Sequence, residues 1–295
     1  MKYSNIISEV CATPWAITRS KLETIIGIVE ARDAGVKMSS EIREQLEAVN
    51  AAREERTGQR QGVAVIGLHG TLSHRPSLFT SGGLSTSEFT QVFNQAVQDE
   101  RIASIVLDVD SPGGSVFGTQ EAADAVFAAR GVKPITAVAN AEAHSAAYHI
   151  ASQADEFVVI PSGMAGSIGV ILPHVDDSEA TEKAGYRVEY ITAGENKAEG
   201  WQTSLSEEYR DHLQSIVDSY YEPFVANVAR GRGASVDQVL DKFGQGRSYG
   251  AEQLLQRGMV DRIATFEQVL NEHVTAAQSN RKRKRQRQAY AASLN

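Results

Sequence analysis

Two short segments of the sequence carry residues suited to acyl-transfer chemistry. The first, residues 111–114, reads Ser-Pro-Gly-Gly and lies between an apolar run and a helical pattern. Its glycines allow a sharp turn and leave main-chain N–H groups open, and a helix start adds further unpaired donors. Such donors can stabilise the oxyanion that forms when a carbonyl group is attacked. A Pro-Gly-Gly sequence by itself, however, is more often an ordinary turn.

The second segment, residues 143–148, places Ser145 at another expected strand-to-helix turn, among alanines. Small neighbours would let a peptide backbone approach the serine hydroxyl. The residue could equally be a plain helix N-cap. A serine nucleophile needs a base to take its proton, so the next question is which side chain could serve.

Histidine is the usual base, and the chain has seven histidines. His149, four residues after Ser145, would share the same helix face. His174 follows the glycine-containing segment 166–170 and is the better histidine candidate. Lys197, which ends the Ala-Gly-Glu-Asn-Lys segment 193–197, is the alternative.

A lysine acts as a base only where burial lowers its pKa, whereas a lysine in a loop is usually solvated. The sequence has no His-Glu-x-x-His pattern and only one cysteine, Cys11. These features exclude a Cys-based metal site and disfavour a zinc hydrolase. We therefore expect a site without metal or cofactor.

The elements that must position these segments alternate between strand and helix. Short β-branched runs between helical patterns indicate parallel strands buried on both faces, joined by right-handed crossovers. Glycines and apolar residues in segment 69–83 suggest a mobile lid or substrate rim. The predicted strands are 63–66, 105–107, 134–138, 157–160 and 188–191, and the predicted helices begin at Ser85, after 114 and at Ser145.

Both ends of the chain read differently from this middle part. Residues 1–60 predict a helical arm, with a capping box at Ser20 and a polar helix over 40–56. Helical patterns return over 204–275, and we expect residues 276–295 to form a basic, disordered tail. The domains expected are thus a 1–60 arm, a 61–275 α/β domain and a 276–295 tail.

The composition narrows the function classes. The 295-residue chain has 42% apolar and 22% charged residues, which excludes wholesale disorder. No apolar run approaches the length of a membrane span, and we expect no secretory signal. Six positive charges lie in 281–287, so the rest of the chain is more acidic than its net charge of −8. An acidic body is not typical of a nucleic-acid-binding domain.

Four segments in order resemble the signal peptide peptidase A family of Ser-Lys peptidases (family S49): 110–114, 145–152, 166–170 and 193–197. Each segment is a weak signal alone, and together they form a strong one. The resemblance covers residues 61–270. It implies a Clp/crotonase-type α/β fold, a spiral of ββα units, with helical N-terminal and C-terminal extensions in this chain.

The resemblance also implies roles for individual residues. Ser145 would be the nucleophile and Lys197 the general base, which later protonates the leaving amine. Gly114 and Ala146 would match the oxyanion donors through their backbone N–H groups, and Ser167 the position that orients the lysine. No cofactor is implied.

Members of this family in bacteria carry a membrane anchor, which we do not find here. Residues 13–17 and the helix after them look like the phage branch, the capsid maturation proteases. That branch implies capsid and scaffold proteins as substrates, a homo-oligomer, and a place in the host cytoplasm or inside the procapsid. A fused scaffold region is expected to be absent or truncated. We expect no membrane or nucleic-acid partner, with the basic tail Arg281–Arg287 as the one exception.

Other readings of the same residues stay open. One is a peptidase-like protein of the bacterial signal-peptide-peptidase type without an anchor. A second is a Clp-type Ser-His-Asp peptidase with His174 as base. A third is a non-proteolytic crotonase-like acyl-CoA enzyme, in which Gly113 and Gly114 would hold a thioester oxygen. The last is a catalytically idle capsid assembly factor.

Overall fold

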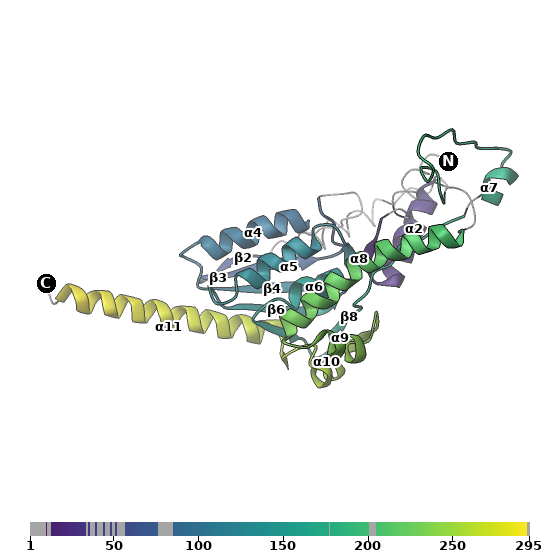
Figure 1. Cartoon of the computed structure of the whole chain (residues 1–295). Coiled ribbons are helices and arrows are strands. Elements are labelled where there is room, and N and C mark those ends of the chain that lie inside the picture. Colours follow the sequence, from purple (N-terminus) through teal and green to yellow (C-terminus); the bar gives the residue numbers. More distant parts are fainter. Residues whose placement is uncertain are drawn as a thin grey trace.

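A parallel β-sheet with helices on both faces forms the centre of the molecule (Figure 1). The computed structural model describes residues 13–33, 57–75, 85–176, 178–200 and 205–293, together with single residues at 10, 35, 39, 44, 48 and 51. The predicted helix over 40–56 lies largely outside the described residues, as does most of the segment between His74 and Gly83.

The sheet order is β10-β7-β6-β4-β3-β2, and every neighbouring pair is parallel except β2 with β3. Four of the predicted strands, those near residues 63, 105, 134 and 157, are confirmed. The strand bounds are β2 Gly58–Arg60, β3 Val63–His69, β4 Ser104–Ser111, β6 Ile135–His144, β7 Glu156–Val159 and β10 Arg262–Ile263.

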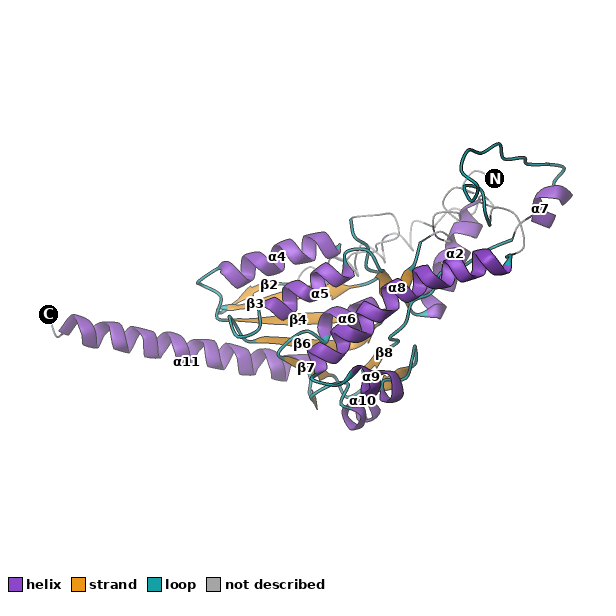
Figure 2. Ribbon diagram, viewed as in Figure 1, coloured by secondary structure: helices purple, strands orange, loops and turns teal. Residues whose placement is uncertain are grey.

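Side chains alternate along these strands between two apolar layers. Ile105 and Leu107 point into the larger layer, with Phe89. Val106 and Val138 point the other way, toward Val269 of the C-terminal helix. Because both faces are covered, the strands are mostly apolar on both sides. Figure 2 shows the helices of the larger layer, which are α4 Thr86–Gln98, α5 Thr119–Ala128, α6 Ala146–Ala151 and α8 Glu207–Arg232.

β6 is the strand that connects the main sheet to a smaller group of elements. Its first half pairs with β4 and β7, and its last residues pair with β8 (Met164–Gly166). β8 in turn pairs with β9 (Ser248–Gly250), which lies between the short helices α9 (Val236–Lys242) and α10 (Ala251–Arg257). The end of β6 is therefore held from both sides.

The N-terminal elements that the structure describes are β1 (Trp15–Ile17) and α2 (Arg19–Asp33), and the helix predicted to include Leu22 is confirmed. The predicted capping box at Ser20 is wrong, because the helix already begins at Arg19 and the Leu22 N–H group bonds to the Thr18 carbonyl group. β1 pairs in antiparallel fashion with β5 (Gly113–Ser115). The N-terminal segment is thus fixed to the glycine-rich turn.

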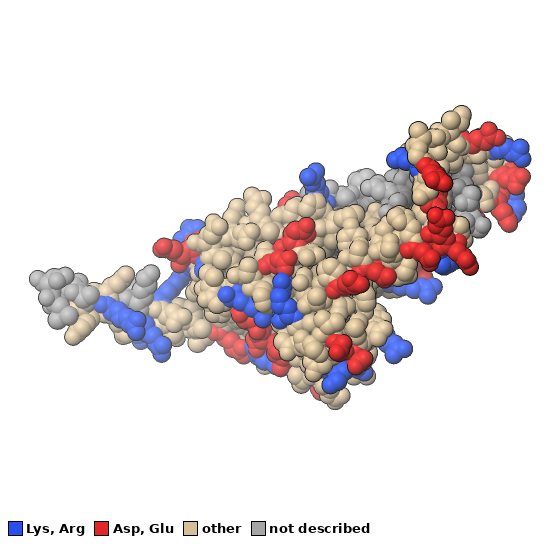
Figure 3. All heavy atoms as spheres, viewed as in Figure 1, with Lys and Arg blue, Asp and Glu red and all other residues tan. Residues whose placement is uncertain are grey.

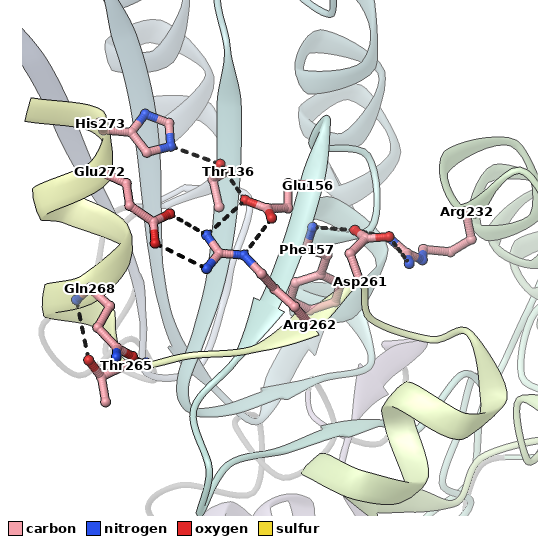
Figure 4. A network of polar contacts seen from close by, with 10 residues as sticks. All are labelled: Thr136, Glu156, Phe157, Arg232, Asp261, Arg262, Thr265, Gln268, Glu272 and His273. Carbon is pink, nitrogen blue, oxygen red and sulfur yellow. Dashed lines mark hydrogen bonds and ion pairs between the residues drawn. The ribbon is translucent and has the colours of Figure 1, made fainter. Parts of the chain in front are cut away.

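A network of charged side chains fixes the C-terminal elements to the sheet (Figure 4). Arg262 of β10 forms ion pairs with Glu156 at 2.6 Å and with Glu272 of α11 (Phe266–Ser293) at 2.7 Å. Arg232 at the end of α8 pairs with Asp261, which also accepts the Phe157 N–H group. Burial opposes the charge on Asp261, but these hydrogen bonds outweigh it and leave the pKa of Asp261 below its usual value.

Two other predicted features differ from the structure. Residues 188–191 form no strand; they lie in an exposed stretch that follows α7 (Ser178–Lys183). The expected disordered tail is instead helical, because α11 continues to Ser293. Arginine, lysine, glutamine and alanine are all good helix formers, and their propensity outweighs the repulsion of like charges.

Basic residues gather on the C-terminal helix. Figure 3 shows Lys and Arg along the protruding part of α11, whereas the opposite end of the molecule carries Asp and Glu together with Lys and Arg. The basic side chains include Arg281, Lys282 and Arg283, which are exposed. Within the described residues, no helix is both long enough and apolar enough to cross a membrane.

Candidate active site

Ser145 stands at the junction between β6 and α6, with its side chain buried beneath other elements. Its N–H group donates to the Gly166 carbonyl group at 2.7 Å, and its carbonyl group accepts the His149 N–H group at 2.9 Å. The hydroxyl group donates to the Gly169 carbonyl group at 3.3 Å. The strand-to-helix turn predicted here is confirmed.

The backbone of Ser145 is strained. Its φ is +53° and its ψ is −114°, in a region that residues other than glycine rarely adopt. Such a conformation costs on the order of 1–3 kcal/mol and tends to occur at functional sites. Ser167, in the neighbouring turn after β8, has a φ of +56°, and its N–H group donates to the Arg247 carbonyl group at 2.8 Å. Both turns are held by the pairing of β8 with β6 and β9.

The glycine-rich turn lies directly against Ser145. A Cβ added to Gly113 would lie 3.0 Å from Ser145 Cβ and would overlap the Ala16 carbonyl oxygen. A Cβ on Gly114 would overlap the carbonyl oxygen of Leu72. Leu72 is held on both sides. Its N–H group donates to the Gly113 carbonyl group, and its carbonyl group accepts a hydrogen bond from the Ser115 N–H group. Only glycine fits at these two positions.

Ala146 is the first residue of α6, so its N–H group points out of the helix start without an acceptor inside that helix. Gly114 and Ala146 therefore flank Ser145, one on the turn and one on the helix. The structure brings together three of the residues that the sequence singled out. These residues follow β4 and β6, at the carboxyl ends of parallel strands, where α/β sites usually lie.

Lys197 lies elsewhere. It belongs to the segment 184–200, and its side chain is exposed. In the described part of the chain, no hydrogen bond joins Lys197 to Ser145 or Ser167. This segment and the residues before it expose large apolar side chains: Val175, Tyr186, Val188, Tyr190 and Ile191 are 45–102% exposed. From here on, the arm means residues 175–200, and residues 1–60 are called the N-terminal segment. Figure 1 shows α7 and the chain after it projecting from the sheet.

The candidate histidines have other partners. The His149 ring is buried, stacks on Phe224 at 4.5 Å and lies 3.1 Å from Asn227 Nδ2. Burial, helped by the positive charge of Arg230, lowers the pKa of His149 to about 3. His174 packs edge-on against Tyr209 of α8. The Ser145 hydroxyl group donates to neither ring.

A small pocket lies between β1 and the helices α5, α6 and α8. Val116, which follows β5, and Val170 complete its lining. Most of its walls are apolar, with the His149 ring on one side. The lining residues are Ala16, Val116, Thr119, Gln120, His149, Val170, Tyr220 and Phe224.

Sequence reasoning missed a buried polar network beneath the turn. His69 Nε2 lies 3.2 Å from Asp108 Oδ2, and Asn140 donates to Asp108 Oδ1 at 2.9 Å. His69 ends β3, whereas Asp108 and Asn140 lie within β4 and β6. The available signal was Asp108, a carboxylate inside an apolar strand pattern. The described residues contain no cluster of His, Cys, Asp and Glu able to hold a metal ion.

The segment 69–83, expected to be a mobile lid or substrate rim, is described only as far as Arg75, and its first part is buried and hydrogen-bonded. Thr71 and Leu72 are buried. The Gly70 N–H group donates to the Asp110 carbonyl group at 2.9 Å, and the Ser111 hydroxyl group donates to the Gly70 carbonyl group at 2.6 Å. This segment is thus a rigid wall behind the glycine-rich turn.

Comparisons with known proteins agree with this geometry. The chain is 33% identical over 205 residues to capsid assembly protease C of Escherichia phage lambda, covering 68% of this chain and 46% of the relative. It is 31% identical to head-tail preconnector protein GP5 of Enterobacteria phage P21, covering 74% and 44%. Protease 4 of Haemophilus influenzae is 27% identical, with 71% and 34% covered. The chain spans less than half the length of these relatives.

Residues 128–280 match the model of Peptidase family S49, which is more than half of the chain. The match includes Ser145, Ser167 and Lys197, whereas Gly114 lies before it. The parallel sheet with helical extensions at both ends agrees with the Clp/crotonase-type fold expected from the sequence. The chain belongs to Peptidase family S49.

Proposed function

We propose that the protein is a serine endopeptidase that uses Ser145 as nucleophile and Lys197 as general base. The observation that carries this proposal is the strained turn at Ser145, which lies against Gly113 in a chain of a peptidase family. The N–H groups of Gly114 and Ala146 serve as oxyanion donors, and Ser167 orients the lysine. No metal or cofactor takes part.

The chemistry follows from these roles. The neutral lysine amine takes the proton of the Ser145 hydroxyl group while Oγ bonds to the peptide carbonyl carbon. The oxyanion accepts hydrogen bonds from the N–H groups of Gly114 and Ala146. When the C–N bond breaks, the lysine returns the proton to the leaving amine and an acyl-enzyme remains. Water then attacks the ester with the same base, and the Ser145 hydroxyl group is restored.

Lys197 must reach Ser145 for this to happen. The arm that carries it exposes a row of apolar side chains, which is what a surface buried by another chain looks like. We therefore propose a homo-oligomer in which the arm of one copy completes the site of another. Equal mixing of Ser145→Ala and Lys197→Ala proteins tests this. Each variant alone should be inactive, and recovery of activity in the mixture requires a shared site. If the mixture stays inactive while each variant still assembles, the lysine acts within its own chain.

The proposed substrates are capsid and scaffold proteins during maturation of a phage procapsid. Support comes from the names of two relatives, a capsid assembly protease and a head-tail preconnector protein. The reaction would then occur in the cytoplasm of the bacterial host or inside the procapsid. Incubation with the neighbouring capsid and scaffold proteins, followed by mass spectrometry, tests this directly. Ser145→Ala is the matched control and should give no products.

A second candidate is a bacterial peptidase of the signal-peptide-peptidase type, favoured by the similarity to protease 4. The two functions differ in substrate. Cleavage of apolar leader peptides, with scaffold and capsid proteins left intact, would replace the maturation role by this one.

A further inference from the structure

The N-terminal strand β1 lies between two segments of the candidate active site. On one side it pairs with β5, with Trp15 opposite Ser115 and Ala16 opposite Gly114. On the other side Trp15 exchanges both of its main-chain hydrogen bonds with Ile171, each at 2.8 Å. β1 is therefore the middle strand of a short antiparallel arrangement beside Ser145.

The register places one carbonyl group of β1 at the proposed oxyanion donor. The Thr18 N–H group donates to the Pro112 carbonyl group, and the Val116 N–H group donates to the Pro14 carbonyl group. In an antiparallel ladder every second pair is hydrogen-bonded. The pair between those two, Ala16 with Gly114, is thus hydrogen-bonded too, and the Ala16 carbonyl group faces the Gly114 N–H group.

Ser145 lies on the same side. A Cβ atom added to Gly113 would lie 3.0 Å from Ser145 Cβ and would overlap the Ala16 carbonyl oxygen, so these two atoms are close neighbours. The Ala16 methyl group lines the small pocket beside His149 and Phe224. The Ser145 side chain is buried with β1 present, so a peptide from solution has no room beside it.

β1 and α2 carry their own apolar cluster. Trp15 and Ile17 point away from the pocket and pack with Val10, Leu22 and Ile25. Among the described residues, Ile171 is the one member of this cluster outside the N-terminal segment, and Ala16 is the one N-terminal residue in the main core. The N-terminal segment can therefore leave the groove while keeping most of its own packing.

We propose that β1 is an intramolecular occupant of the peptide groove. It lies as a substrate would, with Ala16 in the place of the residue whose carbonyl group is attacked. The groove between β5 and residues 169–171 then takes an extended peptide with a small side chain at that place, and it is closed until β1 leaves. This inference rests on the proposed peptidase function.

A reversible lock provides the first test. Trp15 and Ser115 form a pair without mutual hydrogen bonds, in which Cα atoms lie about 4.5 Å apart, a spacing that a disulfide can bridge. The full-length protein with Trp15→Cys, Ser115→Cys and Cys11→Ser should be locked closed when oxidised and free to open when reduced. Binding is measured in a Ser145→Ala background with a fluorescent peptide of the sequence of residues 13–18. We expect at least a ten-fold weaker affinity in the oxidised form.

A second variant moves the equilibrium the other way. Ala16→Phe in the Ser145→Ala background brings a ring that the small pocket cannot hold, so β1 should leave and peptide affinity should rise about ten-fold. Ile28→Phe, on the exposed side of α2, is the control for a larger side chain and should change nothing.

Equal affinity of the oxidised and reduced proteins would overturn the inference, and so would an Ala16→Phe protein that is folded but binds no better than the Ile28→Phe control. Because binding is measured without Ser145, these outcomes do not depend on catalysis. Failure of the peptidase proposal shows itself separately, as an absence of cleavage by the reduced or Ala16→Phe protein that retains Ser145.

Discussion

The turn around Ser145 and the arm that carries Lys197 are opposite kinds of structure. Ser145 is buried, its backbone is strained, and three neighbouring elements hold it. Lys197 is exposed, on a segment without regular structure after α7. One half of the proposed dyad is preformed by the fold of a single chain, whereas the proposed function requires the other half to become ordered on contact with a further surface.

This difference separates the two free-energy costs of the site. The backbone strain at Ser145 lowers the stability of the domain, and this cost arises only when the domain folds. Ordering the arm costs conformational entropy each time the site is completed. Substitutions at the turn should therefore affect both stability and activity, whereas substitutions on the arm should affect activity with little change in the stability of the monomer.

The largest expected effect is at Lys197, where activity should fall while stability does not change. Lys197→Arg should reduce peptide cleavage by about a thousand-fold or more, because a guanidinium group stays protonated and cannot act as a base. The melting temperature should not change, since the side chain is exposed. His174→Ala is the control and should retain most activity. An active Lys197→Arg protein with an inactive His174→Ala protein would assign the base to histidine.

Glycine-to-alanine substitutions compare the stability of the turn around Ser145 with that of the arm. Gly114→Ala should lower the free energy of unfolding by about 3 kcal/mol or more, because its Cβ overlaps a Leu72 carbonyl group that cannot move away. Gly185→Ala, on the arm, meets no atom within 4 Å and carries only the cost of its φ of +83°, about 1–2 kcal/mol. Chemical denaturation measures both. Equal losses would show that the turn can relax, contrary to the rigid wall described here.

Acid should lower the free energy of unfolding, because the buried His149 ring follows the turn at Ser145. The folded pKa of His149 is about 3 and the unfolded one is near 6.5, so between these values the unfolded chain binds the proton and the folded chain does not. Stability is therefore highest above pH 6.5 and falls as the pH drops toward 3, by at most about 1.4 kcal/mol per pH unit. His149→Gln should flatten this dependence in denaturation experiments, whereas His212→Gln, on the exposed side of α8, should leave it unchanged.

The smallest effect on the monomer is expected at Ile191, which is fully exposed. Ile191→Ser should change the free energy of unfolding by no more than about 0.5 kcal/mol. In light scattering it should nevertheless lower the assembled fraction and, with it, the activity. Unchanged assembly would mean that the exposed apolar row of the arm is not an interface.

Local patterns predicted the parts of the fold that depend on local physics. The buried strands of the main sheet and the capping box at Ser85 are confirmed, because their apolar runs and cap residues act within a few positions. Residues 188–191 have the same β-branched pattern but form no strand in this chain. Residue type could not reveal whether a partner strand exists.

The meeting of the glycine-rich turn with Ser145 followed from placing both after neighbouring strands. The pairing of β1 with β5 did not follow, because it joins residues almost a hundred positions apart and leaves no mark in either segment. The positive φ of Ser145 and Ser167 was equally hidden, since strain of this kind is imposed by surrounding elements. The distance of Lys197 from the serine depends on the arm, which the sequence pattern presented as part of the sheet.

Covalent attachment of β1 to the domain has a quantitative consequence. A tethered ligand competes at an effective concentration that reaches the millimolar range, however dilute the protein is. A free peptide at micromolar concentration would seldom displace it, whereas polypeptides packed at millimolar density around the enzyme would do so readily. The groove would then respond to how crowded its surroundings are, and the protein would remain closed when it is diluted among unrelated chains.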